Sequence, residues 1–161
     1  MALIQTARGS QNVQVAEIVL SVADTMRDVA GSLKDMVAVT AGDVFKAISL
    51  PPNVEVIGGE VQVEVQGVGP TAYTMEVGTS SDGTAANFSA SMSGAVDLKG
   101  AVGARTALTL TASAVNPGLQ SAVPNDVFIR LIRSVAAATA GKHVLRVMFV
   151  QRGKVDEAVP A

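Results

Sequence analysis

The residues of this chain that could do chemistry are few, and their spacing fits no common catalytic site. Residues 136–143 (AAATAGKH) contain Gly141-Lys142, as a phosphate-binding loop does. However, Ala136 stands where that loop needs glycine, and His143 stands where it needs the Ser or Thr that holds magnesium. His143 is also the only histidine, and no G-x-S-x-G sequence accompanies it. We therefore predict that this segment is a hairpin connection and that His143 is an ordinary residue at a strand end.

Metal and carboxylate chemistry have equally weak support. The chain has no Cys, which excludes thiolate zinc sites, iron–sulfur clusters and disulfides. Asp82-Gly83 with Asn87 offers too few ligands for calcium. The carboxylates that could serve glycoside hydrolysis are Glu55, Glu60, Glu64 and Glu76. They alternate with apolar residues, so we expect them to face solvent, and we predict no catalytic residue, metal site, cofactor or enzymatic activity.

The composition also limits the partners of this chain. Its 161 residues carry a net charge of −2, and the basic residues are scattered, which argues against nucleic-acid binding. Met1 to Ser10 lacks the apolar stretch of a signal peptide, and the apolar run over 134–140 is too short to span a membrane. We expect a non-secreted protein that binds neither nucleic acid nor a membrane.

The elements that would position any site are short strands. Polar and apolar residues alternate through Val61–Gln66, and the same period of two recurs over 73–77 and 86–92. The expected strands are residues 13–22, 44–50, 54–66, 71–78, 87–92, 105–112, 127–133 and 143–151. Gly, Pro, Asn and Asp separate them, which predicts an all-β fold, an antiparallel β-sandwich of about eight strands.

Two details of these strands carry specific predictions. In 54–66 the apolar residues change from even to odd positions, so we expect a β-bulge at Gly58-Gly59 that keeps them on one face. In 13–37 the apolar residues also fall at helical spacing. We favour a strand over 13–22, followed by a loop with room for about one or two helical turns. Residues 94–103 are expected to be a glycine-rich connection, and residues 134–141 a small and flexible one.

The expected organisation is an N-terminal arm over 1–12, a β-sandwich domain over 13–152 and a C-terminal tail over 153–161. The last strand is apolar on both faces from Val144 to Val150 apart from Arg146. Such a strand is either central in a sandwich or covered by another subunit. Arg130, Arg133 and Arg146 form either a solvated polar face or a contact patch for an acidic partner.

The run from Val39 to Phe88, VTAGDVFKAISLPPNVEVIGGEVQVEVQGVGPTAYTMEVGTSSDGTAANF, together with the later Val96-Asp97-Leu98 and residues 103–108, resembles a known family. The features appear in the order A-G-D-V-F, L-P-P-N, V-I-G-G-E and E-V-G-T-S-S-D-G. The likeness is to the head decoration, or cement, proteins of tailed bacteriophages. It implies a jelly-roll sandwich that is made in the host bacterial cytoplasm and binds the capsid exterior. There it would stabilise the virion by bridging neighbouring major capsid protein subunits as a homo-oligomer, a dimer or trimer.

The resemblance suggests two sets of contact residues. The candidates for self-contact are Val144, Arg146, Met148, Val150 and Arg130. The candidates for capsid contact, in the arm and in the glycine-rich loops, are Arg8, Gln11, Asp82, Asn87, Lys99 and Arg105.

Two other functions stay open from the sequence. One is a tail or head-fibre component that contacts the host surface. The other is a carbohydrate-binding sandwich module, which usually presents aromatic platforms. Tyr73 is the only tyrosine, and it alternates with Met75 and Val77 on the expected inner face.

Overall fold

The computed structural model describes residues 12–40, 42–51, 54–79, 95–109 and 125–151, and these residues form an all-β fold. Its strands are β1 (Gln14–Ser21), β2 (Thr25–Arg27), β3 (Leu33–Asp35), β4 (Val44–Leu50), β5 (Val54–Val68), β6 (Tyr73–Gly78), β7 (Val96–Asp97), β8 (Arg105–Ala107), β9 (Asn125–Arg133) and β10 (Ala140–Gln151). All the strand pairings are antiparallel.

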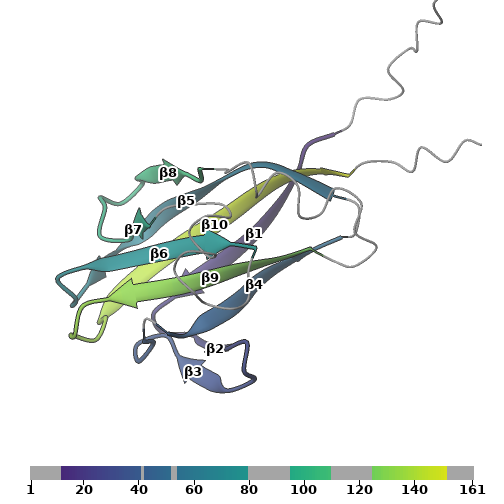
Figure 1. Cartoon of the computed structure of the whole chain (residues 1–161). Helices are drawn as coiled ribbons and strands as arrows, with labels where there is room; N and C mark the ends of the chain where they lie inside the picture. The colour runs from purple at the N-terminus through teal and green to yellow at the C-terminus, as the bar shows by residue number, and fades with distance from the viewer. Residues whose placement is uncertain (1–11, 41, 52–53, 80–94, 110–124, 152–161) are drawn as a thin grey trace, which may run out of the picture.

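The strands form two stacked layers and a small hairpin (Figure 1). One four-stranded layer, here called the β10 sheet, has the order β1-β10-β5-β8. The other, the β9 sheet, has the order β4-β9-β6-β7, and β2 pairs with β3 outside both. Without that hairpin, the first of eight strands pairs with the last, the second with the seventh, the third with the sixth and the fourth with the fifth. A long hairpin rolled up on itself gives this jelly-roll order, so the predicted fold class is confirmed.

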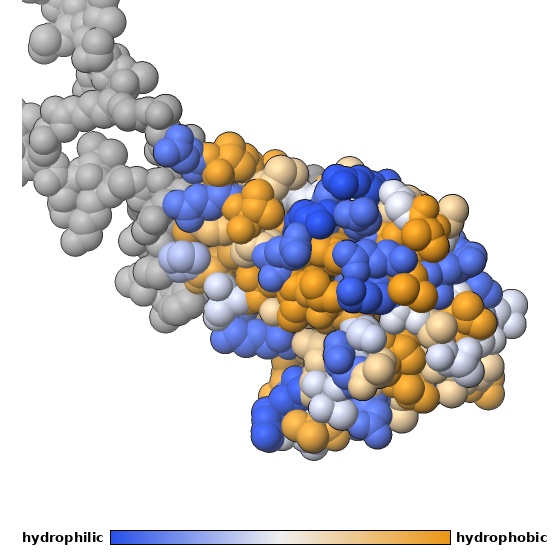
Figure 2. Space-filling model, turned by 180° about the vertical axis from the view of Figure 1, so that it is seen from behind, coloured by the Kyte–Doolittle hydropathy of each residue, from blue (hydrophilic) through white to orange (hydrophobic). Residues whose placement is uncertain are grey.

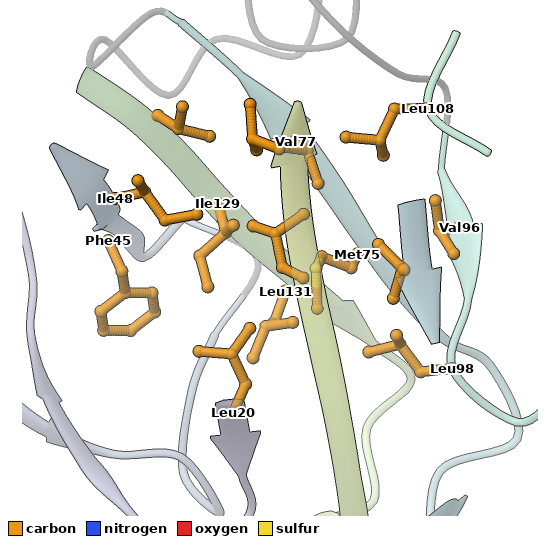
Figure 3. Close-up of a cluster of buried hydrophobic side chains, with 14 of the residues drawn as sticks. Leu20, Phe45, Ile48, Met75, Val77, Val96, Leu98, Leu108, Ile129 and Leu131 are labelled. Carbon is orange, nitrogen blue, oxygen red and sulfur yellow. The ribbon is translucent and has the colours of Figure 1, made fainter. Parts of the chain in front are cut away.

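The core lies between the inner faces of the two sheets (Figure 3). Tyr73, Met75 and Val77 point inward from β6 and are 3%, 0% and 0% exposed, as their alternation predicts. Ile129 and Leu131 of β9 lie beside them and are equally buried. Each such side chain stabilises the fold by about 1.5–3 kcal/mol through removal of apolar surface from water.

β10 is an interior strand of its sheet, with β1 on one side and β5 on the other. Leu145 and Val147 enter the core, while Val144 on the opposite face is still only 1% exposed. This placement accounts for the apolar residues on both faces of the strand. β10 begins at Ala140, so the connection expected over 134–141 is shorter than predicted, and Ala138 within it is fully buried.

The register of β5 differs in detail from the prediction. Gly58 pairs with Met148 and Val56 with Phe149, so the extra residue is Ile57, one position before the expected Gly58-Gly59. The bulge still keeps Val54 and Val61 buried on one face. A second register shift between Val63 and Val65 turns Val65 outward, where it is 44% exposed, so the predicted alternation ends there.

The segment after β1 forms a β-hairpin, and the helical turns expected there are wrong. β2 and β3 pair over three residues each. Asp28 holds the turn, because its Oδ1 accepts a 2.7 Å hydrogen bond from the Ser32 N–H and its carbonyl accepts one from the Gly31 N–H. Gly31 has φ +91, a left-handed angle that glycine adopts without strain.

The structure differs from the predicted strands at two further places. The connection expected over 94–103 contains β7, which pairs with β6, because Leu98 N–H donates to the Tyr73 carbonyl and extends that pairing. β8 ends at Ala107 with Leu108 buried after it, before the predicted end at 112. The strand expected over 87–92, Leu110, most of the arm and the tail lie outside the described residues.

Candidate functional site

A band of charged side chains crosses the outer face of the β10 sheet. Alternation along the strands places Glu17 of β1, Arg146 of β10 and Glu60 of β5 side by side on this face. Arg146 Nε donates to Glu17 Oε2 at 2.6 Å, and its Nη1 donates to Glu60 Oε1 at 3.0 Å and to Gln62 Oε1 at 2.7 Å. Arg105 of β8 adds a 3.0 Å ion pair to Glu60. We call Glu17, Arg146, Glu60, Gln62 and Arg105 the ionic band.

The ionic band fixes the positions of the charged groups on this face and contributes little to the stability of the fold. Hydrogen bonds to Glu17 and Glu60 raise the pKa of Arg146, so the guanidinium stays charged. Exposed ion pairs contribute little to folding because water screens them. Their hydrogen bonds instead give this face a defined pattern of charge.

Apolar side chains lie on both sides of the ionic band. Val15 is 56% exposed and Val19 43% exposed on β1, with Val13 before them at 54%. Ile57, the bulge residue of β5, is 43% exposed. Figure 2, the view from behind, shows hydrophobic surface directly beside hydrophilic surface. This face therefore combines half-exposed apolar side chains with paired charges.

A second feature is an open groove beside the β2–β3 hairpin. Its lining includes Met26 and Phe128, with Arg27, Lys46 and Asp126 at the rim. Lys46 pairs with Asp126 at 2.9 Å, and Arg27 donates to the Gly31 carbonyl. The charged groups of the groove are therefore engaged within the chain, and it offers no reactive pair.

The β9 sheet holds a buried ion pair that corrects the prediction for two residues. Glu76 and Arg130 are opposite each other on β6 and β9 and are only 6% and 7% exposed. Arg130 Nε donates to Glu76 Oε2 at 2.8 Å, and its Nη2 donates to the same oxygen. Glu76 therefore does not face solvent, and Arg130 is not part of a solvated polar face.

His143 lies within β10 and not at its end, and it is 2% exposed. Its Nε2 is 3.0 Å from the Leu98 carbonyl, and Tyr73 packs against the ring edge-to-face at 6.1 Å. Burial lowers the pKa of His143, while the Leu98 hydrogen bond opposes the shift. The imidazole is thus a neutral core group that ties β10 to the segment after β7.

The described residues contain neither a metal-binding cluster nor a membrane-spanning helix. Among those the structure describes, no three of His, Asp or Glu gather where they could hold a metal ion. The described ranges contain no helix long and apolar enough to cross a membrane.

The structure distributes the predicted self-contact residues between the interior and the surface. Val144, Val150 and Arg130 are 1%, 8% and 7% exposed within the single chain, which leaves little surface for another copy. Arg146 and Met148 are half-buried on the outer face of the β10 sheet.

The predicted capsid-contact residues are also separated. The side chain of Arg105 is 58% exposed on β8. Lys99 Nζ donates to the carbonyls of Pro70 and Thr71 at 2.6 and 3.2 Å, so this ammonium fastens a loop. Arg8, Gln11, Asp82 and Asn87 lie outside the described residues.

Sequence reasoning missed the outward residues of β1. Val13, Val15, Glu17 and Val19 are all at odd positions, which is the period of a strand. The competing helical spacing of Val15, Ile18, Val19 and Val22 hid this signal.

Arg133 was predicted to belong either to a solvated polar face or to a contact patch. Its guanidinium instead donates hydrogen bonds to the carbonyls of Val39 and Ala136 within the chain.

Comparison with known proteins identifies the fold but no family. No family model matches the chain, and it matches no curated protein. It is similar to a chain in the cyanophage Pam1 capsid asymmetric unit, with a TM-score of 0.57 and 15% identity over 94% of both chains. It is also similar to a chain in the capsid of Ralstonia phage GP4, with a TM-score of 0.58 and 18% identity over 92% of this chain and 89% of that chain. These likenesses show a shared jelly-roll fold.

Proposed function

We propose that this protein is a non-enzymatic component of a phage virion that binds the outer surface of the capsid and bridges neighbouring major capsid protein subunits. The proposal rests on how much of each chain takes part in the structural matches. Nearly all of this chain aligns with nearly all of a chain in each of two phage capsid structures. The likeness is therefore to whole chains of about this length, and it agrees with the decoration-protein pattern in the sequence.

The physical character of the fold supports the same role. The space between the sheets is filled by apolar side chains, so the described residues offer binding groups mainly on the outer faces and loops. A capsid presents its subunits in many copies, so a weak contact at each subunit adds up when one bound unit touches several. A rigid two-layer sheet suits such bridging, because a load on one strand spreads through the hydrogen-bonded ladder.

Arg105 is the described residue that we propose for capsid contact. It lies on β8 at one edge of the β10 sheet, and its guanidinium ends the ionic band. Its exposed side chain makes one 3.0 Å ion pair with Glu60, which leaves further donors for an acidic shell surface. Arg8, Gln11, Asp82 and Asn87 stay predictions for the same contact.

Add-back to purified heads tests the proposal. Heads stripped of the protein should rebind it in a co-sedimentation assay and should then resist heat better. Arg105→Glu should weaken binding, whereas Arg27→Glu, the same charge reversal on exposed β2, should bind like the unaltered protein. Absence of binding to heads, or binding with no change in their heat resistance, would contradict the proposed function.

A further inference from the structure

β1 is an edge strand of the β10 sheet, and half of its backbone groups point away from that sheet. Val22 N–H donates to the Gly141 carbonyl across the ladder, so even-numbered residues of β1 bond to β10. The odd-numbered residues therefore direct their N–H and C=O groups to the opposite side. No described strand lies on that side of β1. Val15, Glu17 and Val19 thus present a row of hydrogen-bonding groups at a free edge.

One end of this edge is closed by the chain itself. Ser21 N–H donates to Asp24 Oδ2 at 3.1 Å, and the Ser21 carbonyl accepts from the Asp24 N–H at 3.1 Å. The open part of the edge therefore runs from Val13 to Val19, and Ala16 is its midpoint. A strand that pairs with this edge has that stretch available.

The described edge lacks two common protections against strand pairing. Gln14–Ser21 contains no Lys and no Pro, which natural edge strands use to block another chain. Its single charged residue, Glu17, is already paired with Arg146 at 2.6 Å, so it opposes a partner strand less than a free charge would. Val13, Val15 and Val19 are about half exposed, so a partner strand would also remove apolar surface from water.

We propose that β1 of a second copy pairs antiparallel with this edge, about a two-fold axis at Ala16. The axis places Val13 opposite Val19 of the partner subunit and Val15 opposite Glu17 of the partner subunit. All the open odd-numbered positions are then paired. An axis at Glu17 would set two carboxylates face to face, and an axis at Ile18 would match Val15 with the already bonded Ser21 of the partner subunit.

The resulting dimer is isologous and joins two β10 sheets into one continuous sheet. It also aligns the ionic bands of both copies on one outer face, with the Arg105 edges at the far ends. The inference deepens the proposed function, since it names the surface by which copies join, but its tests use the isolated protein. A failure in solution is therefore distinguishable from a failure to bind heads.

A cysteine cross-link tests the register directly. The chain has no native Cys, so Ala16→Cys introduces one thiol per copy. At the axis the two Ala16 residues form a non-hydrogen-bonded pair about 4.5 Å apart between Cα atoms, within the range of a disulfide. Gln14→Cys is the matched control on the same face of β1, and its thiols would be about 13 Å apart. Under mild oxidation, disulfide dimer should form at least tenfold faster for the Ala16→Cys variant, and equal rates would overturn the proposal.

Charge variants test the same pairing without a disulfide. Val15→Glu places a carboxylate opposite Glu17 of the partner subunit at two symmetric positions and should raise the dimer Kd about 2- to 30-fold. Val15→Lys faces the same carboxylate and should leave the Kd unchanged or lower. Val102→Glu and Val102→Lys, on a side chain that is 69% exposed, are the controls for net charge.

Sedimentation of all four variants decides the outcome, with circular dichroism to show that each is folded. A raised dimer Kd for Val15→Glu, with no rise for Val15→Lys and no difference between Glu and Lys at position 102, would support the pairing. Equal effects at positions 15 and 102, or a monomer throughout the concentration range, would overturn it. Capture of an extended peptide of the shell protein at β1, with no self-association, would overturn it as well.

Discussion

The buried ion pair between Glu76 and Arg130 leads to a sharp prediction for stability. Arg130→Met removes the cation that faces the Glu76 carboxylate, and that carboxylate belongs to a buried residue. Breaking one side of a buried pair costs about 3–5 kcal/mol, because a charge then stays in a poorly solvated place. Met fills a similar volume, so the cost is electrostatic more than a cavity effect.

The magnitude follows from the burial of both side chains. They are 8% and 9% exposed, whereas those of the surface pair Lys46 and Asp126 are 50% and 25% exposed. Lys46→Met should therefore cost less than about 1 kcal/mol. For a chain of this length each kcal/mol lowers Tm by about 2–4 °C, so Arg130→Met should lower Tm by about 6–20 °C.

Urea unfolding and thermal melts of four variants, Arg130→Met, Glu76→Gln, their combination and Lys46→Met, measure this. The double variant Glu76→Gln with Arg130→Met should recover most of the loss, since the carboxylate that faced the guanidinium is then also replaced by a neutral amide. If Arg130→Met loses no more free energy of unfolding than Lys46→Met, the pair is solvated and the reasoning from burial is refuted. If the double variant is less stable than both Arg130→Met and Glu76→Gln, the loss is not due to removal of the guanidinium from a buried carboxylate.

Two further predictions concern the packing of β5 and the buried imidazole. A Cβ at Gly59 would lie 2.6 Å from Leu108 Cδ1 and 2.7 Å from the Arg146 carbonyl oxygen, so Gly59→Val should destabilise the fold by about 1–3 kcal/mol in urea titrations. Gly42→Val, where nothing lies within 4 Å, is its control, and equal losses would contradict the packing argument. Burial lowers the pKa of His143 in the folded protein below its ordinary value. As the pH falls below about 6.5, the imidazole therefore takes up a proton more readily in the unfolded chain than in the folded protein, and the free energy of unfolding should decrease. Urea midpoints from pH 8 to pH 5 should therefore fall more steeply for the native chain than for His143→Gln, and parallel curves would show that His143 is not the cause.

The sequence predicts the strands well where one face packs against the core. Tyr73, Met75 and Val77 are buried as expected, because period-two alternation is a local signal that the sandwich does not overrule. The jelly-roll order came from the resemblance and not from the pattern, since alternation does not specify which strands pair.

Features that depend on a partner strand were not predictable in the same way. The change of apolar positions along 54–66 predicts a bulge, but its exact place at Ile57 and the outward turn of Val65 follow from the register against β10. The same holds for Glu76, since its alternation predicts a solvent-facing residue, whereas its cross-strand neighbour is Arg130. The ionic band likewise forms only when four strands are placed side by side.

A difference map between heads with and without the bound protein, obtained by electron cryomicroscopy, tests the central claim most directly. The account predicts jelly-roll density on the outer surface, in contact with more than one shell subunit, with Arg105 directed at the shell. Density on the tail alone, or heads whose outer surface is unchanged by the protein, would contradict it.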